Sequence, residues 1–172
     1  MRRLRLLLVL AIAPAAALVT LAGCVSAGQT VAAEETQTPG AAMLDFKSLE
    51  KASSPNRWLI APSFYLEVSE PDAEAPTFNQ DRQTVFAAVE AAVNDEPRVS
   101  ERLIDRERFQ LRYTATVPLF RFKDDVDIAV LPGADPNTST IAIYSRSRVG
   151  HSDLGVNKHR AESILRTIKS KL

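Results

Sequence analysis

The amino-acid sequence predicts an α+β fold: a two-layer sandwich in which two helices cover one face of an antiparallel meander of about four strands. Two segments, one in the middle of the chain and one at its end, carry apolar residues at helical spacing. Between them lie segments in which apolar and polar residues alternate, the pattern of half-buried strands. This order of elements favours packing both apolar helix faces on one sheet.

The chain ahead of the first helix predicts little regular structure. Residues 53–56 look like the entry to the domain, and 57–78 are irregular and rich in proline. We expect only short extended pieces there, at 57–60 and 63–66.

The first helix is predicted after Asn79, a good capping residue. Its apolar face consists of Val85, Phe86, Val89, Ala92 and Val93. Pro97 should end the helix, because proline cannot donate a backbone hydrogen bond.

Strand patterns follow this helix. Residues 99–105 are short and charged, which suits the edge of a sheet. Residues 111–117 and 120–130 alternate between apolar and polar, but the parity changes across Pro118. We therefore expect a bulge or bend at that proline.

The last two strands predict a hairpin with a definite register. Turn residues occupy 131–137, and 141–148 forms the returning strand. The register that matches apolar with apolar residues pairs Val130 with Ile141, Ala129 with Ala142, Ile128 with Ile143, Asp125 with Arg146, and Asp124 with Ser147. We therefore expect a cross-strand ion pair between Asp125 and Arg146.

Asp124 has the parity of its apolar neighbours, so its side chain should point toward the helix layer. A carboxylate buried there must be hydrogen-bonded or paired. The expected partners are Ser145, Ser147, Arg148 and the backbone amides of 150–155. On this interpretation Asp124 latches the strand end to the loop before the last helix.

The C-terminal segment predicts an amphipathic helix whose apolar face consists of Ala161, Ile164, Leu165, Ile168 and Leu172. Gly150 and Gly155 permit the backbone angles that a tight loop before it needs. Asp153 and Asn157 offer caps to the amides at the helix start.

The N-terminal residues predict export. A basic run at 1–5 precedes an apolar stretch at 6–21, as in a secretory signal peptide. The sequence Leu-Ala-Gly-Cys ending at Cys24 resembles the lipobox of bacterial lipoproteins. That resemblance implies cleavage before Cys24 and acylation of this residue, and Val25 after it resembles lipoproteins sent to the outer membrane.

We therefore divide the chain into a lipoprotein signal peptide (1–23), a flexible tether (24–53) and a single α+β domain (54–172). The domain is expected on the cell membrane or outer membrane, facing the periplasm or the exterior. The expected partners are the membrane, through the lipid anchor, and an envelope protein or a small anion.

Composition narrows the function classes. Cys24 is the only cysteine, so neither an intramolecular disulfide nor a cysteine metal site can form. Removing the signal peptide lowers the 21 basic residues to 18, against 21 acidic ones. This mild excess of negative charge argues against a nucleic-acid partner, and no cofactor is expected.

Two motifs and the domain entry resemble a known family. Residues 120–126, Phe-Arg-Phe-Lys-Asp-Asp-Val, and 145–160, Ser-Arg-Ser-Arg-Val-Gly-His-Ser-Asp-Leu-Gly-Val-Asn-Lys-His-Arg, are similar to hallmarks of the bacterial and plastid family called domain of unknown function 1499. Residues 54–56, Ser-Pro-Asn, resemble its entry motif. Many members have a cysteine shortly after that motif, where this chain has Arg57 and Trp58. The resemblance covers about 55–172 and implies no established activity.

The candidate binding or structural cluster consists of Asp124, Asp125, Arg146, Arg148, Asp153, Asn157 and Arg160. We interpret it chiefly as a structural junction in a non-enzymatic envelope lipoprotein. One alternative is a small-molecule or lipid-processing enzyme that uses Asp124, Arg146 and Asp153. Another is an anion-binding module built from Arg146, Arg148, Lys158 and Arg160 near a helix start.

Two further chemistries fit the sequence poorly. A hydrolytic triad from Ser145 or Ser147 with His151 and Asp153 lacks a nucleophile elbow, and its base and acid lie only two residues apart. A metal site would need the aspartates of 124–127 beside His151, but strand alternation turns these carboxylates to different faces. A deep pocket at the cluster would favour ligand chemistry, and a closed lattice of salt bridges would favour structure.

Overall fold

The computed structural model describes residues 42–118 and 121–172. The expected signal peptide, the expected lipidation site Cys24 and most of the expected tether lie outside the described residues. Within the described part of the chain, neither helix has the length and apolar character needed to cross a membrane.

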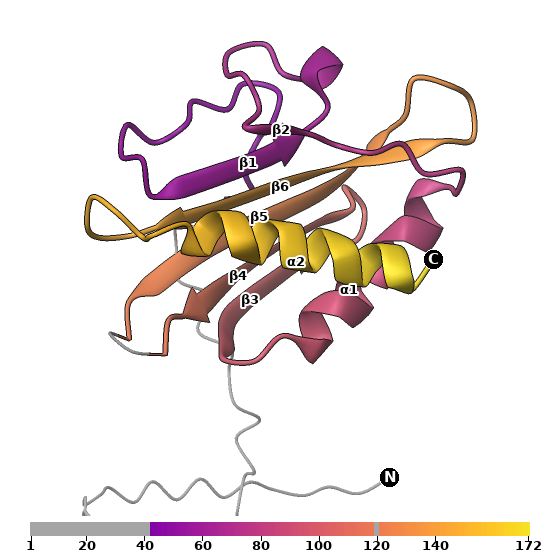
Figure 1. The fold of residues 1–172 in the computed structure, drawn as a ribbon. Helices are drawn as coiled ribbons and strands as arrows, with labels where there is room; N and C mark the ends of the chain where they lie inside the picture. The colour runs from indigo at the N-terminus through magenta and orange to yellow at the C-terminus, as the bar shows by residue number, and fades with distance from the viewer. Residues whose placement is uncertain (1–41, 119–120) are drawn as a thin grey trace, which may run out of the picture. The chain divides into compact units, whose positions relative to one another are not determined.

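A six-stranded sheet forms one layer, and two α-helices pack side by side on one of its faces (Figure 1). The strands are β1 (Arg57–Ala61), β2 (Ala73–Glu74), β3 (Val99–Asp105), β4 (Gln110–Thr116), β5 (Lys123–Pro132) and β6 (Ser139–Ser147). The helices are α1 (Arg82–Asp95) and α2 (Val156–Ser170). The predicted α+β class is confirmed, but about four strands was an undercount.

The strand order is β2-β1-β6-β5-β4-β3, so the last four strands form the predicted antiparallel meander. The sheet continues past β6 because β1 pairs antiparallel with β6, and β2 pairs parallel with β1. β1 coincides with the extended piece expected at 57–60. The piece expected at 63–66 is instead a short 3-10 turn, Ser63–Tyr65. β2 is too short to show a sequence pattern.

The main core lies between the sheet and the helices. Every apolar residue predicted for the face of α1 is buried. In α2, Ala161, Ile164 and Ile168 are fully buried, whereas Leu172 stays 38 % exposed beyond the end of the helix. The cap of α1 is Asp81 rather than Asn79, since an Asp81 oxygen accepts from the Thr84 amide at 2.7 Å.

The other face of the sheet is covered in part by the chain that precedes β1. Phe46 and Leu49 are buried there in a second apolar cluster with Leu59 and Tyr144. The Ala52 amide donates to the Tyr144 hydroxyl at 2.8 Å. The packed domain therefore begins before residue 54, and 42–53, which we had assigned to the tether, belong to it.

The predicted register of β5 with β6 is confirmed at every predicted pair. β4 and β5 are joined by a turn in which the Val117 amide donates to the Phe122 carbonyl and Arg121 has a φ of 54°. The expected irregularity near Pro118 is this turn, and residues 119–120 within it lie outside the described part of the chain.

Candidate functional site

The predicted cluster does not form one site, because the sheet divides it. Side chains alternate along a strand, so Asp124 points to the helix layer while Asp125 and Arg146 lie on the opposite face. Asp153 lies on the helix side, at the start of α2. The three residues of the enzymatic alternative, Asp124, Arg146 and Asp153, are therefore not brought together.

The helix-side half is a hydrogen-bonded group that we call the junction network. It consists of Asn56, Asp124, Ser145, Ser147, Asp153, Asn157 and Arg160. Four of these residues are buried completely or almost so: Asn56, Asp124, Ser145 and Asn157. A buried polar side chain is tolerated only when it finds partners, and these residues supply partners to one another.

Asn157 is the centre of the junction network. Its side-chain nitrogen donates to the Asn56 carbonyl at 2.9 Å, to the Ser147 hydroxyl at 3.0 Å and to Asp153 at 2.6 Å. Its side-chain oxygen accepts from the Ser145 hydroxyl at 2.6 Å and from Arg160 at 3.0 Å. Asn157 therefore ties the start of α2 to β6 and to the chain entering β1, and does not act as the cap that we expected.

Asp124 points toward the helix layer, as predicted. Its ion-pair partner is Arg160 of α2, at 2.7 Å, rather than the serines, Arg148 or loop amides that we expected. The carboxylate side chain is 1 % exposed and the guanidinium side chain 12 % exposed. Among the described residues, Asp124 Oδ1 has no hydrogen-bond partner, so Arg160 alone compensates this buried charge.

Asp153 binds exposed amides at the start of α2, as predicted, although the residue at the N-cap position itself is Gly155. One of its oxygens accepts from the Gly155 amide at 3.1 Å and the other from the Asn157 amide at 2.7 Å. Gly155 has a φ of 82° and Gly150 a φ of 87°, angles that a side chain disfavours. The interpretation of this loop as a junction between strand and helix is consistent with each of these contacts.

Asn56 is a member that sequence reasoning missed. Its side-chain nitrogen donates to the carbonyls of Val149 and Gly150, both at 3.0 Å. Its backbone carbonyl accepts from the Ser147 amide at 3.1 Å. The entry motif at 54–56 was the sequence feature that could have pointed to Asn56. The role of Asn56 is to hold the loop between β6 and α2.

The helix-free face carries the other half of the cluster. Asp127 is 2 % exposed and accepts from Arg112 at 2.5 Å and from Arg146 at 2.7 Å. Arg148 bonds Asp125 and Glu101, each at 2.8 Å.

The ion pair predicted between Asp125 and Arg146 is therefore wrong, although the two residues are register partners. Arg146 of β6 and Arg148 just beyond it instead each reach a carboxylate two residues along β5 on the same face. Strand twist accounts for this, because it brings one diagonal of neighbours within reach of a long side chain.

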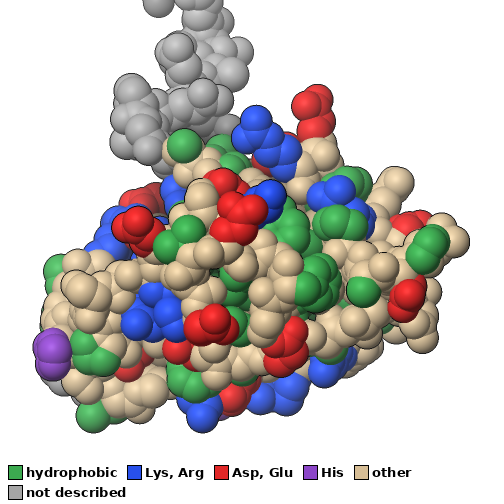
Figure 2. All heavy atoms as spheres, turned by 90° about the horizontal axis from the view of Figure 1, so that it is seen from above, with side chains coloured by type: hydrophobic (Ala, Val, Ile, Leu, Met, Phe, Trp, Pro, Cys, Tyr) green, Lys and Arg blue, Asp and Glu red, His purple; other side chains and the backbone are tan. Residues whose placement is uncertain are grey.

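The charged side chains at the exposed end of the helix-free face form ion pairs with one another. Hydrogen bonds from Lys123, Thr114 and Arg148 lower the pKa of Glu101 to about 2. Asp125 and Glu101 in turn raise the pKa of Arg148. Figure 2 shows acidic and basic side chains interspersed on one face of the molecule, without a large area of a single sign.

The four basic residues of the anion-binding alternative do not converge. Arg146 and Arg148 lie on the helix-free face and Arg160 pairs with Asp124. Lys158 has its ammonium 4.8 Å from the centre of the Trp58 ring. Among the described residues, no group of three or more acidic, histidine or cysteine side chains is arranged to hold a metal ion.

Two hollows of the described surface lie away from the predicted cluster. One of about 720 Å³ runs along α1 to the last residues of the chain, and one of about 430 Å³ lies between Arg82, Phe109 and Pro132. Neither is lined by a residue of the predicted cluster. The cluster is thus two closed lattices of polar contacts, the geometry that favours a structural role.

Replacing Asp153 by alanine is expected to lower the free energy of unfolding by about 0.5–2 kcal/mol, because the amides of Gly155 and Asn157 at the start of α2 lose their acceptor. Denaturant unfolding measures this. Ser152→Ala is the matched control: its hydroxyl is exposed and accepts only a long contact of 3.5 Å, so a change within about 0.5 kcal/mol is expected. Equal stability of Asp153→Ala and the parent would contradict the cap.

Comparison with known proteins adds family placement. The family model described as "Protein of unknown function (DUF1499)" matches residues 21–168. No curated protein matches the chain. Similar solved structures include the crystal structure of TTHA0849 from Thermus thermophilus, with 12 % sequence identity and a TM-score of 0.38, covering 56 % of this chain and 92 % of that chain.

Proposed function

The chain belongs to the family described as protein of unknown function (DUF1499), and we propose that it is a lipid-anchored protein of the bacterial cell envelope with a binding or structural domain. In this domain the charged and polar residues of the predicted cluster stabilise the fold. It stands on the cell membrane or outer membrane, facing the periplasm or the exterior. Its partner is an envelope protein.

The observation that carries the non-enzymatic part is that the arginines of the cluster are paired with carboxylates of the same domain. Arg160 is bound to Asp124, Arg146 to Asp127, and Arg148 to Asp125 and Glu101. A catalytic acid, base or nucleophile must instead face a space where substrate can bind. The two hollows described above, along α1 and beside Phe109, lie away from these groups.

The support for the anchor comes from the sequence. A basic run, an apolar stretch and a cysteine preceded by Leu-Ala-Gly follow one another at 1–24. One acyl chain holds a protein to a membrane only reversibly, but several chains make a durable anchor. A lipoprotein cysteine carries several chains, so a domain without a spanning helix can remain on the membrane.

Replacing Cys24 by serine is expected to abolish lipid attachment and to leave a soluble or uncleaved form of the chain. Cells labelled with radioactive palmitate and then fractionated measure this directly. Ser26→Ala, two residues further on, is the matched control and should keep both the label and the membrane pelleting. A parent chain that carries no label, or a Cys24→Ser chain that still pellets with membranes to the same extent, would refute the anchor.

A further inference from the structure

One end of the sheet presents apolar side chains to solvent. Leu154 is 96 % exposed, Val149 is 53 % exposed and Phe122 is 48 % exposed. We call these three residues the apolar tip. Single exposed apolar residues are ordinary on proteins, but a group of them marks a contact surface.

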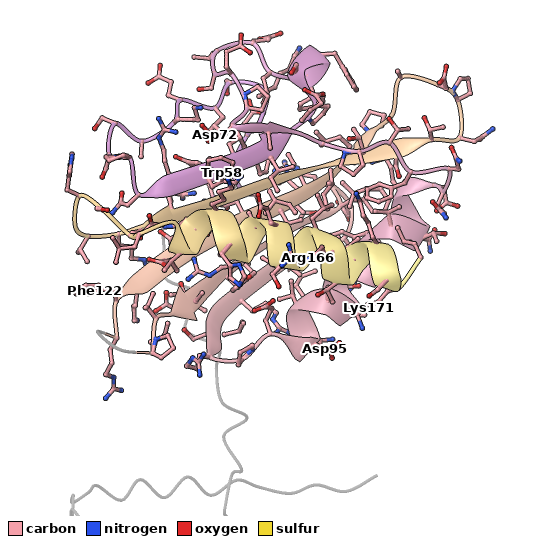
Figure 3. The ribbon with its side chains drawn as sticks, in the orientation of Figure 1. Trp58, Asp72, Asp95, Phe122, Arg166 and Lys171 are labelled. Carbon is pink, nitrogen blue, oxygen red and sulfur yellow. The ribbon has the colours of Figure 1, made fainter. Side chains whose placement is uncertain are left out.

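The three residues belong to one end of the molecule. The Arg148 amide donates to the Lys123 carbonyl at 3.1 Å, so Val149 after β6 and Phe122 before β5 follow at the same end of the sheet. Leu154 lies in the loop that begins with Val149. Figure 3 shows Phe122 at the end of the sheet where this loop joins α2.

The loop that carries the tip is held from behind by the junction network. Asn56 binds the carbonyls of Val149 and Gly150, and Asp153 binds the amides that follow Leu154. The loop is therefore fixed on the inside while its apolar side chains face outward. Such a preorganised loop can insert its side chains into a partner without first being ordered.

Leu154 is a poor choice for its position as far as stability is concerned. Its φ is 54°, an angle at which asparagine or glycine is much less strained than leucine. Its side chain buries almost nothing to compensate. A residue that breaks a local rule without stabilising the fold points to a use outside the fold.

Basic residues flank the tip in the sequence. The exposed Arg121 precedes Phe122, and Lys158 and His159 follow on the first turn of α2. Asp153 is the only acidic residue in 148–159, and its two oxygens are bound to backbone amides. Exposed Arg121 and Lys158 close to apolar side chains in the sequence suit an anionic lipid surface, although Glu101 pairs with Lys123 and Arg148 at this end and the mature chain carries a small negative excess.

The chain outside the described residues keeps such a surface within reach. Residues 25–41 separate Cys24 from the described domain, and a segment of this length spans at most about 60 Å. The Ala42 carbonyl accepts from Arg112 at 2.9 Å, and β4 runs from Arg112 toward the turn that bears Phe122. The distance along β4 to that turn is only about 15–20 Å.

We propose that the apolar tip inserts into the interface of the membrane that holds the anchor and prefers anionic lipid. This inference rests on the proposed function, because the lipid anchor is what brings the domain to a membrane. The tip then fixes the orientation of the domain as a second, weaker contact. The several acyl chains of the anchor already hold the chain durably, so the tip adds orientation rather than attachment.

The test uses the chain without its first 23 residues and with Cys24→Ser, so that the tip is the only membrane signal. Both apolar cores lie within residues kept by this chain. Binding is measured by cosedimentation with vesicles of phosphatidylcholine, with and without phosphatidylglycerol. Leu154→Asn removes the most exposed tip residue, and Val68→Asn, at an equally apolar residue that is 58 % exposed outside the tip, is the matched control.

We expect the parent to bind anionic vesicles better than neutral ones, and Leu154→Asn to weaken partitioning about tenfold, as expected for losing one buried leucine. Its melting temperature should not fall, because asparagine relieves the backbone at this position. Val68→Asn should bind like the parent. A loss confined to Leu154→Asn would support the tip.

No vesicle binding by the parent, or equal binding by Leu154→Asn and the parent, would overturn the inference. Capture of an envelope protein by the tip in the absence of vesicle binding would assign this surface to a protein partner and would also overturn it. Neither result bears on the proposed lipid anchor, because palmitate labelling of Cys24 tests the anchor independently of vesicle binding.

Discussion

Replacing Arg160 by alanine is expected to lower the free energy of unfolding by about 3–5 kcal/mol. The change leaves the Asp124 carboxylate 1 % exposed with no opposite charge, and its Oδ1 already lacks a partner among the described residues. It also removes the donor to the Ser145 hydroxyl and to the Asn157 side chain. A fall of the melting temperature on the order of 10 °C or more should accompany this loss.

Denaturant unfolding followed by circular dichroism gives the free energy. Arg166→Ala is the matched control, because Arg166 lies on the same helix with an exposed side chain (Figure 3). It should change stability by no more than about 0.5 kcal/mol. If the two arginine variants lose equal stability, the Asp124–Arg160 pair does not hold α2 to the sheet.

Arg160→Ala is expected to cost more stability than Asp153→Ala, because the Arg160 guanidinium and its partner carboxylate are both largely buried. A lost cap exposes amides to water, whereas a lost partner leaves a charge stranded in the interior.

Replacing Asn157 by alanine is expected to cost about 2–4 kcal/mol, because it removes the shared partner of several buried groups. The Ser145 hydroxyl loses its acceptor, and the Asn56 carbonyl and the Ser147 hydroxyl lose a donor. Each buried group left unsatisfied costs about 1–3 kcal/mol, reduced where another partner remains.

The neighbouring variant Lys158→Ala is the control for Asn157→Ala in the same unfolding experiment. It removes one ammonium above the Trp58 ring, a contact worth about 0.5–1 kcal/mol at an exposed site. Should Asn157→Ala prove no more damaging than Lys158→Ala, the junction network would have little energetic weight.

The sheet register could be predicted from the sequence because apolar matching leaves one solution. Shifting β5 against β6 by one residue would turn Ile128 and Val130 to the wrong face. The same alternation correctly turned Asp124 inward. Its partner could not be predicted, because the rotation and position of α2 over the sheet decide that Arg160 reaches it.

The salt bridges of the helix-free face could not be predicted from the sequence pattern for a different reason. Register predicts which residues are opposite, but twist decides which diagonal a long side chain takes. Asp127 was considered only as a metal ligand. Asp127 shares a sheet face with Asp125, and arginines stand at matching positions on both neighbouring strands. This pattern was the signal that Asp127 would pair with Arg112 and Arg146.

Two parts of the fold had too little pattern to be predicted. β2 has two residues and exists because it lies along β1. The segment at 43–49 has mixed polarity, so its burial of Phe46 and Leu49 on the helix-free face follows only from the apolar surface that the sheet leaves uncovered there.

The central claim is that the junction network holds the fold together and performs no chemistry. Replacing both Asp124 and Arg160 by leucine tests it, because removing both members of a buried ion pair restores much of the stability that losing one member costs. The decisive measurement is whether this double variant restores a normal cell envelope to a strain that lacks the chain. The account predicts full restoration, whereas a double variant that is folded and membrane-bound but fails to restore the envelope would contradict it.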